Sequence, residues 1–241
     1  MTTDLQGRIV LVTGANGGLG DQFVSQALLR GAAKVYAAAR TPKDVTDSRV
    51  VPLPLDITDP DAVAGAATTA ADVDLVVNNA GIAPTGDSIS GPEDELRRVF
   101  ETNFFGTVRV ANAFAPVLGR NGGGTLVNVL SAAAWLSVPT GYAASKAALW
   151  SATNALRLEL LGQGTQVIGL LVGMVDTPMS TRWDVPKVSA ASVVTQAYDG
   201  VVAGALEVLA DDSTRELKAH LATPAEQLYP PQHELLAAFR A

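Results

Sequence analysis

Hydrophobic residues in this chain gather into short β-branched runs that alternate with Ala-rich stretches of helical length. The runs are apolar nearly throughout instead of alternating with polar residues, as is typical of parallel strands that helices cover on both faces. Strands are therefore expected at residues 8–13, 34–39, 50–55, 74–78, 125–131 and 166–172, with a further strand at 207–210. Helices are expected at residues 18–30, 59–70, 93–118, 142–162 and 190–204.

The repeated strand, helix, strand order predicts an α/β fold, with a doubly wound parallel sheet and helices on both faces in three layers. No linker rich in Pro, Gly or Ser divides the chain, so residues 1–241 are expected to form one domain. In such sheets, ligands bind beyond the carboxyl ends of the strands. Site residues are therefore sought at these ends.

Composition excludes several classes of function. The net charge of −7 and the absence of a basic run argue against a nucleic-acid partner. The chain has no Cys, and its two histidines, His220 and His233, lie near the C-terminus, so we expect no metal site and no His-based catalysis. Without a signal-like N-terminus or a run of about 18 apolar residues, the sequence predicts a soluble, cytoplasmic protein with no membrane partner.

A glycine-rich segment, TGANGGLG, follows the first strand and leads into a helix. Gly14, Gly18 and Gly20 permit a tight turn in which backbone amides approach a pyrophosphate at the helix N-terminus. Their spacing, Gly-x-x-x-Gly-x-Gly, differs from the G-x-G-x-x-G fingerprint of dinucleotide-binding proteins. Taken alone, the segment is also consistent with an ordinary turn.

The ends of the next strands suggest where the rest of a dinucleotide would bind. The second strand ends in Ala39 and Arg40, with no carboxylate to accept the ribose 2′-hydroxyl of NAD, so Arg40 favours the 2′-phosphate of NADP; it can equally be an exposed arginine. Asp56 is placed either to accept from an adenine amino group or to cap a helix. The NNAG segment, residues 78–81, suits a tight turn against a ribose, although ordinary loops use the same residues.

Tyr142 and Lys146 lie four residues apart in the segment YAASK. In a helix this spacing turns the chain by about 400° and raises it by about 6 Å, so both side chains share one face. An ammonium about 5 Å from the phenol oxygen would stabilise the phenolate by roughly 3 kcal/mol at an effective dielectric constant near 20, lowering its pKa towards about 8. The pair is thus either an acid/base with its tuning charge or an unrelated exposed pair.

Taken in order, TGANGGLG, NNAG, Asn103, Ser131 and YAASK resemble the compact short-chain dehydrogenase/reductase family. The resemblance covers roughly residues 8–180. It implies a Rossmann-like fold and reversible hydride transfer between NADP(H), with NAD(H) possible, and a ketone, aldehyde or secondary alcohol, as in alcohol dehydrogenases and carbonyl reductases. It also implies a homo-oligomer, a dimer or tetramer built through the helices that carry Asn103 and Tyr142.

The resemblance assigns roles to individual residues. Tyr142 matches the catalytic acid/base, and Lys146 matches the residue that lowers the tyrosine pKa and binds the nicotinamide ribose. Ser131 matches the hydroxyl that holds the substrate oxygen, and Asn103 the residue that keeps a water in a proton relay. Cofactor contacts are implied for the remaining matching positions: Gly14, Asn16, Gly18, Leu19 and Gly20 at the pyrophosphate, Asp56 and Ile57 at the adenine, Asn79, Ala80 and Gly81 at the ribose, Arg40 at the 2′-phosphate, and Gly173, Val175 and Thr177 at the carboxamide.

The chain departs from the family pattern in several places. Val172 stands where the family commonly has proline, the interval from Ser131 to Tyr142 is shorter than usual, and the glycine-rich segment lacks the second basic residue often found with NADP. The tail from residue 215 does not resemble the common glycine-ended last strand. We expect it to form helices that cover a neighbouring subunit or the substrate entrance, with residues 178–241 supplying the substrate loop and a C-terminal cover.

The substrate is expected to be a small apolar carbonyl compound or alcohol. Residues 132–138, with Trp135, and the loop after Thr177, with Trp183, are candidate walls of its site, although each tryptophan fits the core equally well. Three other functions stay open: a sugar-nucleotide epimerase or dehydratase on the same fold, a non-catalytic dinucleotide sensor, and an interaction protein. A sensor is expected to have lost Tyr142 or Lys146, and the chain keeps both.

Overall fold

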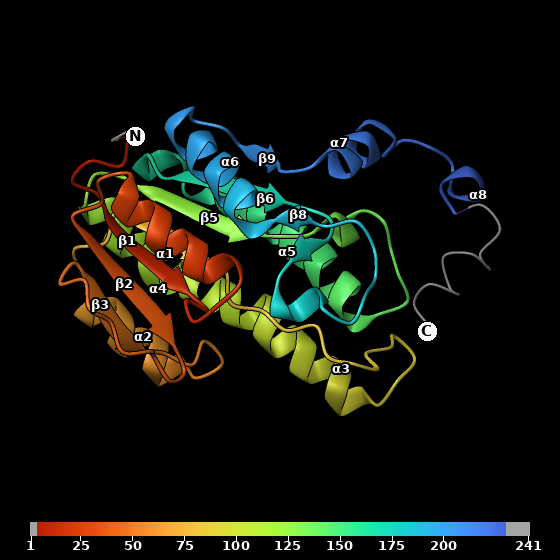
Figure 1. The fold of residues 1–241 in the computed structure, drawn as a ribbon, viewed down its shortest axis with the longest axis horizontal. Coiled ribbons are helices and arrows are strands. Elements are labelled where there is room, and N and C mark those ends of the chain that lie inside the picture. The colour runs from red at the N-terminus through yellow and green to blue at the C-terminus, as the bar shows by residue number, and fades with distance from the viewer. Residues whose placement is uncertain (1–3, 230–241) are drawn as a thin grey trace.

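The computed structural model describes residues 4–229 of the 241-residue chain. Its centre is a seven-stranded sheet in the order β3-β2-β1-β4-β5-β6-β9, and every neighbouring pair is parallel (Figure 1). The expected strands are confirmed, with ends that differ by at most two residues: β1 (Ile9–Thr13), β2 (Lys34–Ala39), β3 (Val50–Pro54), β4 (Leu75–Asn78), β5 (Thr125–Val129), β6 (Gln166–Leu171) and β9 (Glu207–Leu209).

Helices cover both faces of this sheet, as the nearly unbroken apolar strands predict. On one face, α1 (Leu19–Leu29) and α6 (Ala190–Val202) meet through Phe23 and Tyr198, whose rings pack edge to face at 5.5 Å. On the other face, α2 (Pro60–Thr69), α4 (Thr107–Arg120) and α5 (Gly141–Glu159) bury a second apolar cluster that includes Phe114. The fold is therefore a single-domain, three-layered, Rossmann-like sheet.

The prediction of a single continuous helix over residues 93–118 is wrong in one respect. It consists of α3 (Glu93–Phe100), a π-helical turn (Glu101–Gly106) and α4, and Asn103 lies in the wider turn. Two contacts from distant loops hold this segment. The Asn103 side chain is hydrogen-bonded to the backbone of Ile82. Gly106 packs so closely against Ile57 that a Cβ on Gly106 would lie 2.9 Å from the Ile57 Cδ1 atom. Hydrophobic periodicity does not report such contacts. Turns of this kind often occur at functional sites.

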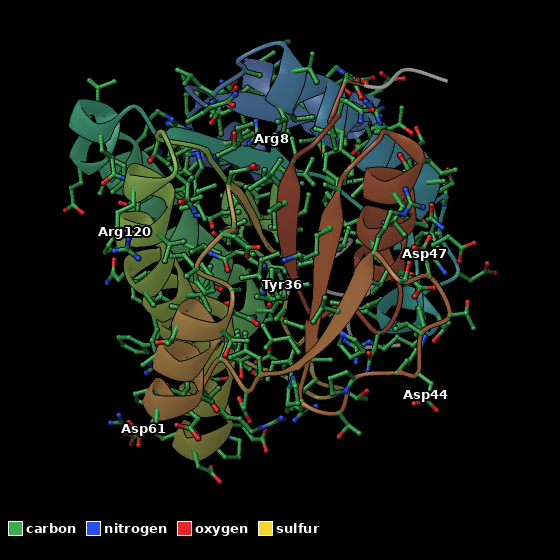
Figure 2. The ribbon with its side chains drawn as sticks, turned by 90° about the vertical axis from the view of Figure 1, so that its left-hand side faces the viewer. Arg8, Tyr36, Asp44, Asp47, Asp61 and Arg120 are labelled. Atoms are coloured by element: carbon green, nitrogen blue, oxygen red, sulfur yellow. The ribbon has the colours of Figure 1, made fainter. Side chains whose placement is uncertain are left out.

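The two ends of the sheet differ in character. At the amino end, Arg8 donates to Asp74 and Thr125 and thereby connects the start of β1 to the starts of β4 and β5. Figure 2 shows Arg8 at this end and the segment 40–49, with Asp44 and Asp47 labelled, returning from the carboxyl end of β2 to the start of β3. The strand order reverses between β1 and β4, which places the expected ligand crevice at their carboxyl ends.

The chain beyond β6 builds smaller elements near the carboxyl edge. Strands β7 (Val175–Asp176) and β8 (Val188–Ser189) pair, and after β9 the helices α7 (Asp212–Ala219) and α8 (Ala225–Leu228) extend away from the sheet (Figure 1). The expected helices of the tail are thus present up to residue 229, whereas His233 and the last residues lie outside the described part. Short 3-10 turns complete the chain: Ala132–Ala134, Leu161–Gln163 and Pro178–Ser180. None of the helices described between residues 4 and 229 has the length and apolarity to cross a membrane.

Candidate active site

The glycine-rich segment forms a tight turn between β1 and α1. Gly14 and Gly18 have φ angles of +65° and +56°, which side chains other than glycine rarely adopt. Gly20 is required by space, because a Cβ there would lie 2.1 Å from the carbonyl oxygen of Gly14. The N–H of Gly20 donates to the Gly17 carbonyl at 3.1 Å, and no side chain caps the other first amides of α1, which begins at Leu19. These amides are therefore oriented to bind an anion at the helix N-terminus.

The NNAG segment is hydrogen-bonded directly to this turn. The hydroxyl of Thr13 accepts from the backbone N–H groups of Asn79 and Ala80 at 3.0 and 3.1 Å, and the Asn79 amide donates to the carbonyls of Thr13 and Gly14. A Cβ on Gly14 would lie 2.9 Å from the Ala80 Cα atom. The sequence analysis identified Gly14, Asn79 and Ala80 but missed Thr13, and the available signal was its position as the last strand residue before the first glycine.

The predicted adenosine residues surround the ends of β2 and β3. The Asn16 side chain binds the Thr41 carbonyl at 2.7 Å and the Lys43 N–H at 3.3 Å, which fixes the chain just after the exposed Arg40. The backbone N–H of Thr58, and next its hydroxyl, lower the pKa of Asp56, and the charge of Arg40 acts in the same direction. The charge of Arg40 therefore acts on Asp56 across the carboxyl ends of β2 and β3.

Ile57 follows Asp56 and is buried in the second apolar cluster. Its carbonyl accepts a hydrogen bond from Arg109 at 2.7 Å, and Arg109 in turn pairs with Glu101 at 2.9 Å. Arg109 was missed by the sequence analysis, since nothing in the spacing of α4 marks it. It connects the predicted adenine pocket to the π-helical turn that carries Asn103.

Tyr142 and Lys146 share one face of α5, as the spacing predicts. The Lys146 side chain is buried, its Nζ atom donates to the carbonyl of Val129 at 2.7 Å, and it lies 5.7 Å from the centre of the Tyr142 ring. Val129 ends β5, so this bond attaches the amine to the carboxyl edge of the sheet. Lys146 is therefore inside the protein and Tyr142 is half-buried, so the two do not form an exposed surface pair.

The pKa values of the pair differ from the expectation. Burial raises the pKa of the Tyr142 phenol above its ordinary value, while the nearby Ser131 hydroxyl acts in the opposite direction. Burial lowers the pKa of Lys146 to about 8. The predicted lowering of the phenol pKa towards 8 is thus wrong for this structure, because burial of the phenol outweighs the hydrogen bond with Ser131.

Asn103 is fully buried and all of its side-chain polar atoms are bound. Its Oδ1 atom accepts from the N–H of Ile82 at 2.8 Å, and its Nδ2 atom donates to the Ile82 carbonyl at 2.9 Å and to the Ser145 hydroxyl at 3.1 Å. Ser145, which the sequence analysis missed, donates in turn to the Tyr142 carbonyl at 2.7 Å. Asn103 is thereby fixed to the helix that carries the Tyr142 and Lys146 pair. The water relay expected of Asn103 stays a prediction.

Ser131 and the segment after β6 complete the edge. Ser131 is buried, and its hydroxyl accepts from the N–H of Ala133 at 3.1 Å. Val172 is buried where the family has proline, and its carbonyl accepts from Ala132 at 2.9 Å. A Cβ built on Gly18 would lie 3.2 Å from the methyl group of Thr177, so the segment from Val175 to Thr177 adjoins the glycine-rich turn.

The two candidate wall tryptophans have different surroundings. Trp135 is buried in a third apolar cluster, where its ring meets that of Trp150 edge to face at 6.0 Å. Trp135 therefore belongs to the core. Trp183 is partly exposed and stacks with the guanidinium of Arg182 at 3.9 Å.

A buried polar chain behind the site was also missed by the sequence analysis. The Asn78 amide donates to Asn128 at 3.0 Å, and Asn128 donates to the Thr153 hydroxyl at 2.9 Å. All three residues are buried, and they join β4, β5 and α5. Because an unpaired buried amide is costly, this chain fixes the relative position of the three elements that carry the site.

The doubly wound sheet, with a glycine turn and a Tyr–Lys pair at its carboxyl edge, defines a Rossmann-like α/β protein. Residues 8–187 match the family described as short chain dehydrogenase. A short chain dehydrogenase from Burkholderia cenocepacia, solved in complex with NADP, is 36% identical with a TM-score of 0.87, over 95% of this chain and 98% of that one.

Two further relatives agree. The 1-deoxy-11-beta-hydroxypentalenate dehydrogenase of Streptomyces exfoliatus is 34% identical over 226 residues, which cover 86% of this chain and 82% of the relative. A 3-ketoacyl-(acyl-carrier-protein) reductase from Brucella melitensis, complexed with NADH, shares the fold at 24% identity and a TM-score of 0.77, over 86% of this chain and 98% of that one. This chain belongs to the short-chain dehydrogenase/reductase family.

Proposed function

We propose that the protein is an NADP(H)-dependent oxidoreductase that transfers hydride between the nicotinamide and a ketone, aldehyde or secondary alcohol. The observation that carries the proposal is the convergence of Tyr142, Lys146, Ser131 and Asn103 at the carboxyl edge of the sheet, beside the glycine-rich turn. The carbonyl reductase and alcohol dehydrogenase types describe its two directions.

Each of the four residues has a role in reduction. A dinucleotide held at the glycine-rich turn would supply the hydride for the carbonyl carbon. Tyr142 gives its phenolic proton to the carbonyl oxygen, which yields the alcohol and leaves a phenolate. Lys146, positively charged below a pH of about 8, stabilises that phenolate. Ser131 orients the carbonyl oxygen, and Asn103 holds α5 in place through Ser145. The raised pKa of Tyr142 keeps the phenol protonated near neutrality, which suits the reductive direction.

The residues at the glycine-rich turn fit a dinucleotide. The turn excludes side chains at Gly14 and Gly20, and the uncapped amides of α1 would hold the pyrophosphate. Arg40 would bind the 2′-phosphate, since no carboxylate ends β2 to select NAD. The NADP bound to the Burkholderia cenocepacia relative supports this preference, while NAD(H) is the alternative cofactor.

In this proposal, residues 178–241 supply a substrate loop and a C-terminal cover, of which the structure describes residues 178–229. In the described part, Arg182 donates to the Thr85 hydroxyl at 2.7 Å, and the Tyr229 hydroxyl accepts from the Ser137 N–H at 3.0 Å. These bonds link the two segments to the loops after β4 and β5, which supports a site for a small apolar substrate there. Exposed Phe105 and Leu158, on the segments that carry Asn103 and Tyr142, support a homodimer or homotetramer. A single monomer peak in light scattering would contradict that assembly.

The test is an assay panel of acetophenone, cyclohexanone, benzaldehyde and the corresponding alcohols, run in parallel with the phosphorylated and unphosphorylated cofactors. We expect NADPH absorbance to fall with at least one carbonyl compound, and Tyr142→Phe to lower kcat by at least about 100-fold. Tyr36→Phe is the matched control, because the Tyr36 hydroxyl pairs with Asp72 outside the site. Full turnover by Tyr142→Phe would exclude the mechanism.

A further inference from the structure

The helix that carries Tyr142 begins against a carboxylate from a distant loop. Asp87 lies in the segment between β4 and α3, and it accepts hydrogen bonds from the N–H of Gly141 at 3.0 Å and from the N–H of Tyr142 at 2.7 Å. The same segment binds just ahead of the helix, where the N–H of Ile89 donates to the carbonyl of Pro139 at 3.1 Å. The start of α5 is therefore attached to the loop that follows β4.

These bonds complete the cap of α5. The first amides of a helix have no partner within it, and a side chain before the helix ordinarily satisfies one of them. Thr140 does so for the N–H of Ala143 at 3.1 Å. Asp87 takes the two amides that remain in the first turn, and its negative charge is favourable at the positive end of the helix.

Gly141 makes this contact possible. A Cβ at that position would lie 2.9 Å from the Asp87 Oδ1 atom and 2.8 Å from the Leu96 Cδ1 atom. Gly141 has no unusual φ angle, so alanine would fit its backbone and would collide only with these two side chains. An alanine there would displace the carboxylate without removing it.

We propose that Asp87 is a positioning residue for the catalytic tyrosine, and this inference rests on the function proposed above. Lys146 is anchored to β5 through the carbonyl of Val129, whereas Tyr142 is anchored through its own N–H to Asp87. The distance between phenol and amine therefore depends on two separate attachments. Loss of the Asp87 contact frees the first turn of α5 and moves the phenol relative to an amine that stays in place.

Four variants test this role with NADPH and the carbonyl compound of the panel that the wild type reduces fastest. Asp87→Ala removes both acceptor oxygens, Asp87→Asn replaces one of them with an NH2 donor, and Gly141→Ala displaces both. Asp59→Ala is the matched control, because Asp59 accepts from two first-turn amides of α2, the N–H groups of Asp61 and Ala62, outside the site. We expect the Asp87 and Gly141 variants to lower kcat by about 10- to 100-fold, since small misplacements of reacting groups have effects of this size. The NADPH dissociation constant should not change.

Two further measurements isolate the contact. Hydrogen exchange at the amides of Gly141 and Tyr142 should become faster in Asp87→Ala and stay unchanged in Asp59→Ala, and it needs no substrate. The double variant Asp87→Ala/Gly141→Ala should lose less activity than the two single losses combined, because both changes break the contact with Asp87.

Several results would overturn the inference. An Asp87→Ala protein with full kcat beside an inactive Tyr142→Phe protein would refute the positioning role and leave the proposed function intact. An equal loss of kcat in Asp59→Ala, a loss of NADPH affinity in step with kcat, or unchanged amide exchange would also refute it. If Asp87→Ala does not fold, Gly141→Ala tests the positioning role by the same measurements. Full turnover by Tyr142→Phe would refute both proposals together.

Discussion

The buried amine of Lys146 should make the free energy of unfolding depend on pH in a characteristic way. Its pKa falls from 10.5 to about 8 on folding, which at about 1.4 kcal/mol per pKa unit corresponds to about 3 kcal/mol. Because the folded state disfavours the charged amine, this destabilisation is fully present below a pH of about 8 and disappears as the pH rises through the unfolded value of 10.5. Lys146→Met removes the titrating group.

The unfolding free energy of wild type minus that of Lys146→Met should therefore rise by about 3 kcal/mol between a pH of about 7 and about 10.5. The lost hydrogen bond to Val129 costs about 1 kcal/mol at every pH and does not affect this difference. Urea unfolding of the protein without cofactor measures it. Lys34→Met is the control. The hydrogen bond to Asp72 raises the pKa of Lys34, so the unfolding free energy of wild type minus that of Lys34→Met should fall as the pH rises. If the unfolding free energies of wild type and Lys146→Met change with pH in the same way, the amine is not desolvated and the reasoning is refuted.

Three other outcomes are expected. Arg40→Ala should weaken NADPH binding by about 2 kcal/mol and leave NADH binding unchanged in a fluorescence titration; equal losses would place Arg40 away from the 2′-phosphate. Gly20→Ala should destabilise the fold by about 1–3 kcal/mol and impair binding of both cofactors, because its Cβ would meet the Gly14 carbonyl. The kcat for reduction should fall as the pH rises through about 8, where Lys146 loses its proton; a rate that stays flat to a pH of about 10 would contradict this.

Much of the fold could be predicted because its strands are buried on both faces. β4 and β5 are buried at every residue, so their sequences are mainly apolar, although β5 also contains the buried Asn128. The π-helical turn could not be predicted in this way. It depends on Ile82 and Ile57, which are distant in sequence from Asn103 and Gly106.

The same distinction between local pattern and tertiary contact applies to the candidate site. Tyr142 and Lys146 were predictable because four residues of helix place them on one face. The pKa of Tyr142 was not, since its direction depends on burial, and the sequence does not show how much protein surrounds the ring. Asp87 was missed for a similar reason. It lies 54 and 55 positions from the amides it binds, and no local pattern connects a loop aspartate to a helix that far away.

The π-helical turn also determines which parts of the protein α3 and α4 contact, because it sets the rotation of one helix relative to the other. Each residue rotates an α-helix by about 100°, and a π turn accommodates one residue more than an α turn. The part before it places Leu96 against Gly141 at the head of α5, while the part after it presses Phe114 into the sheet. If this segment were one residue shorter and wound throughout as an α-helix, α3 would be rotated about the helix axis by about 100°. Leu96 would then no longer contact Gly141. Because of the π-helical turn, α3 can pack against the start of α5 while α4 packs against the sheet.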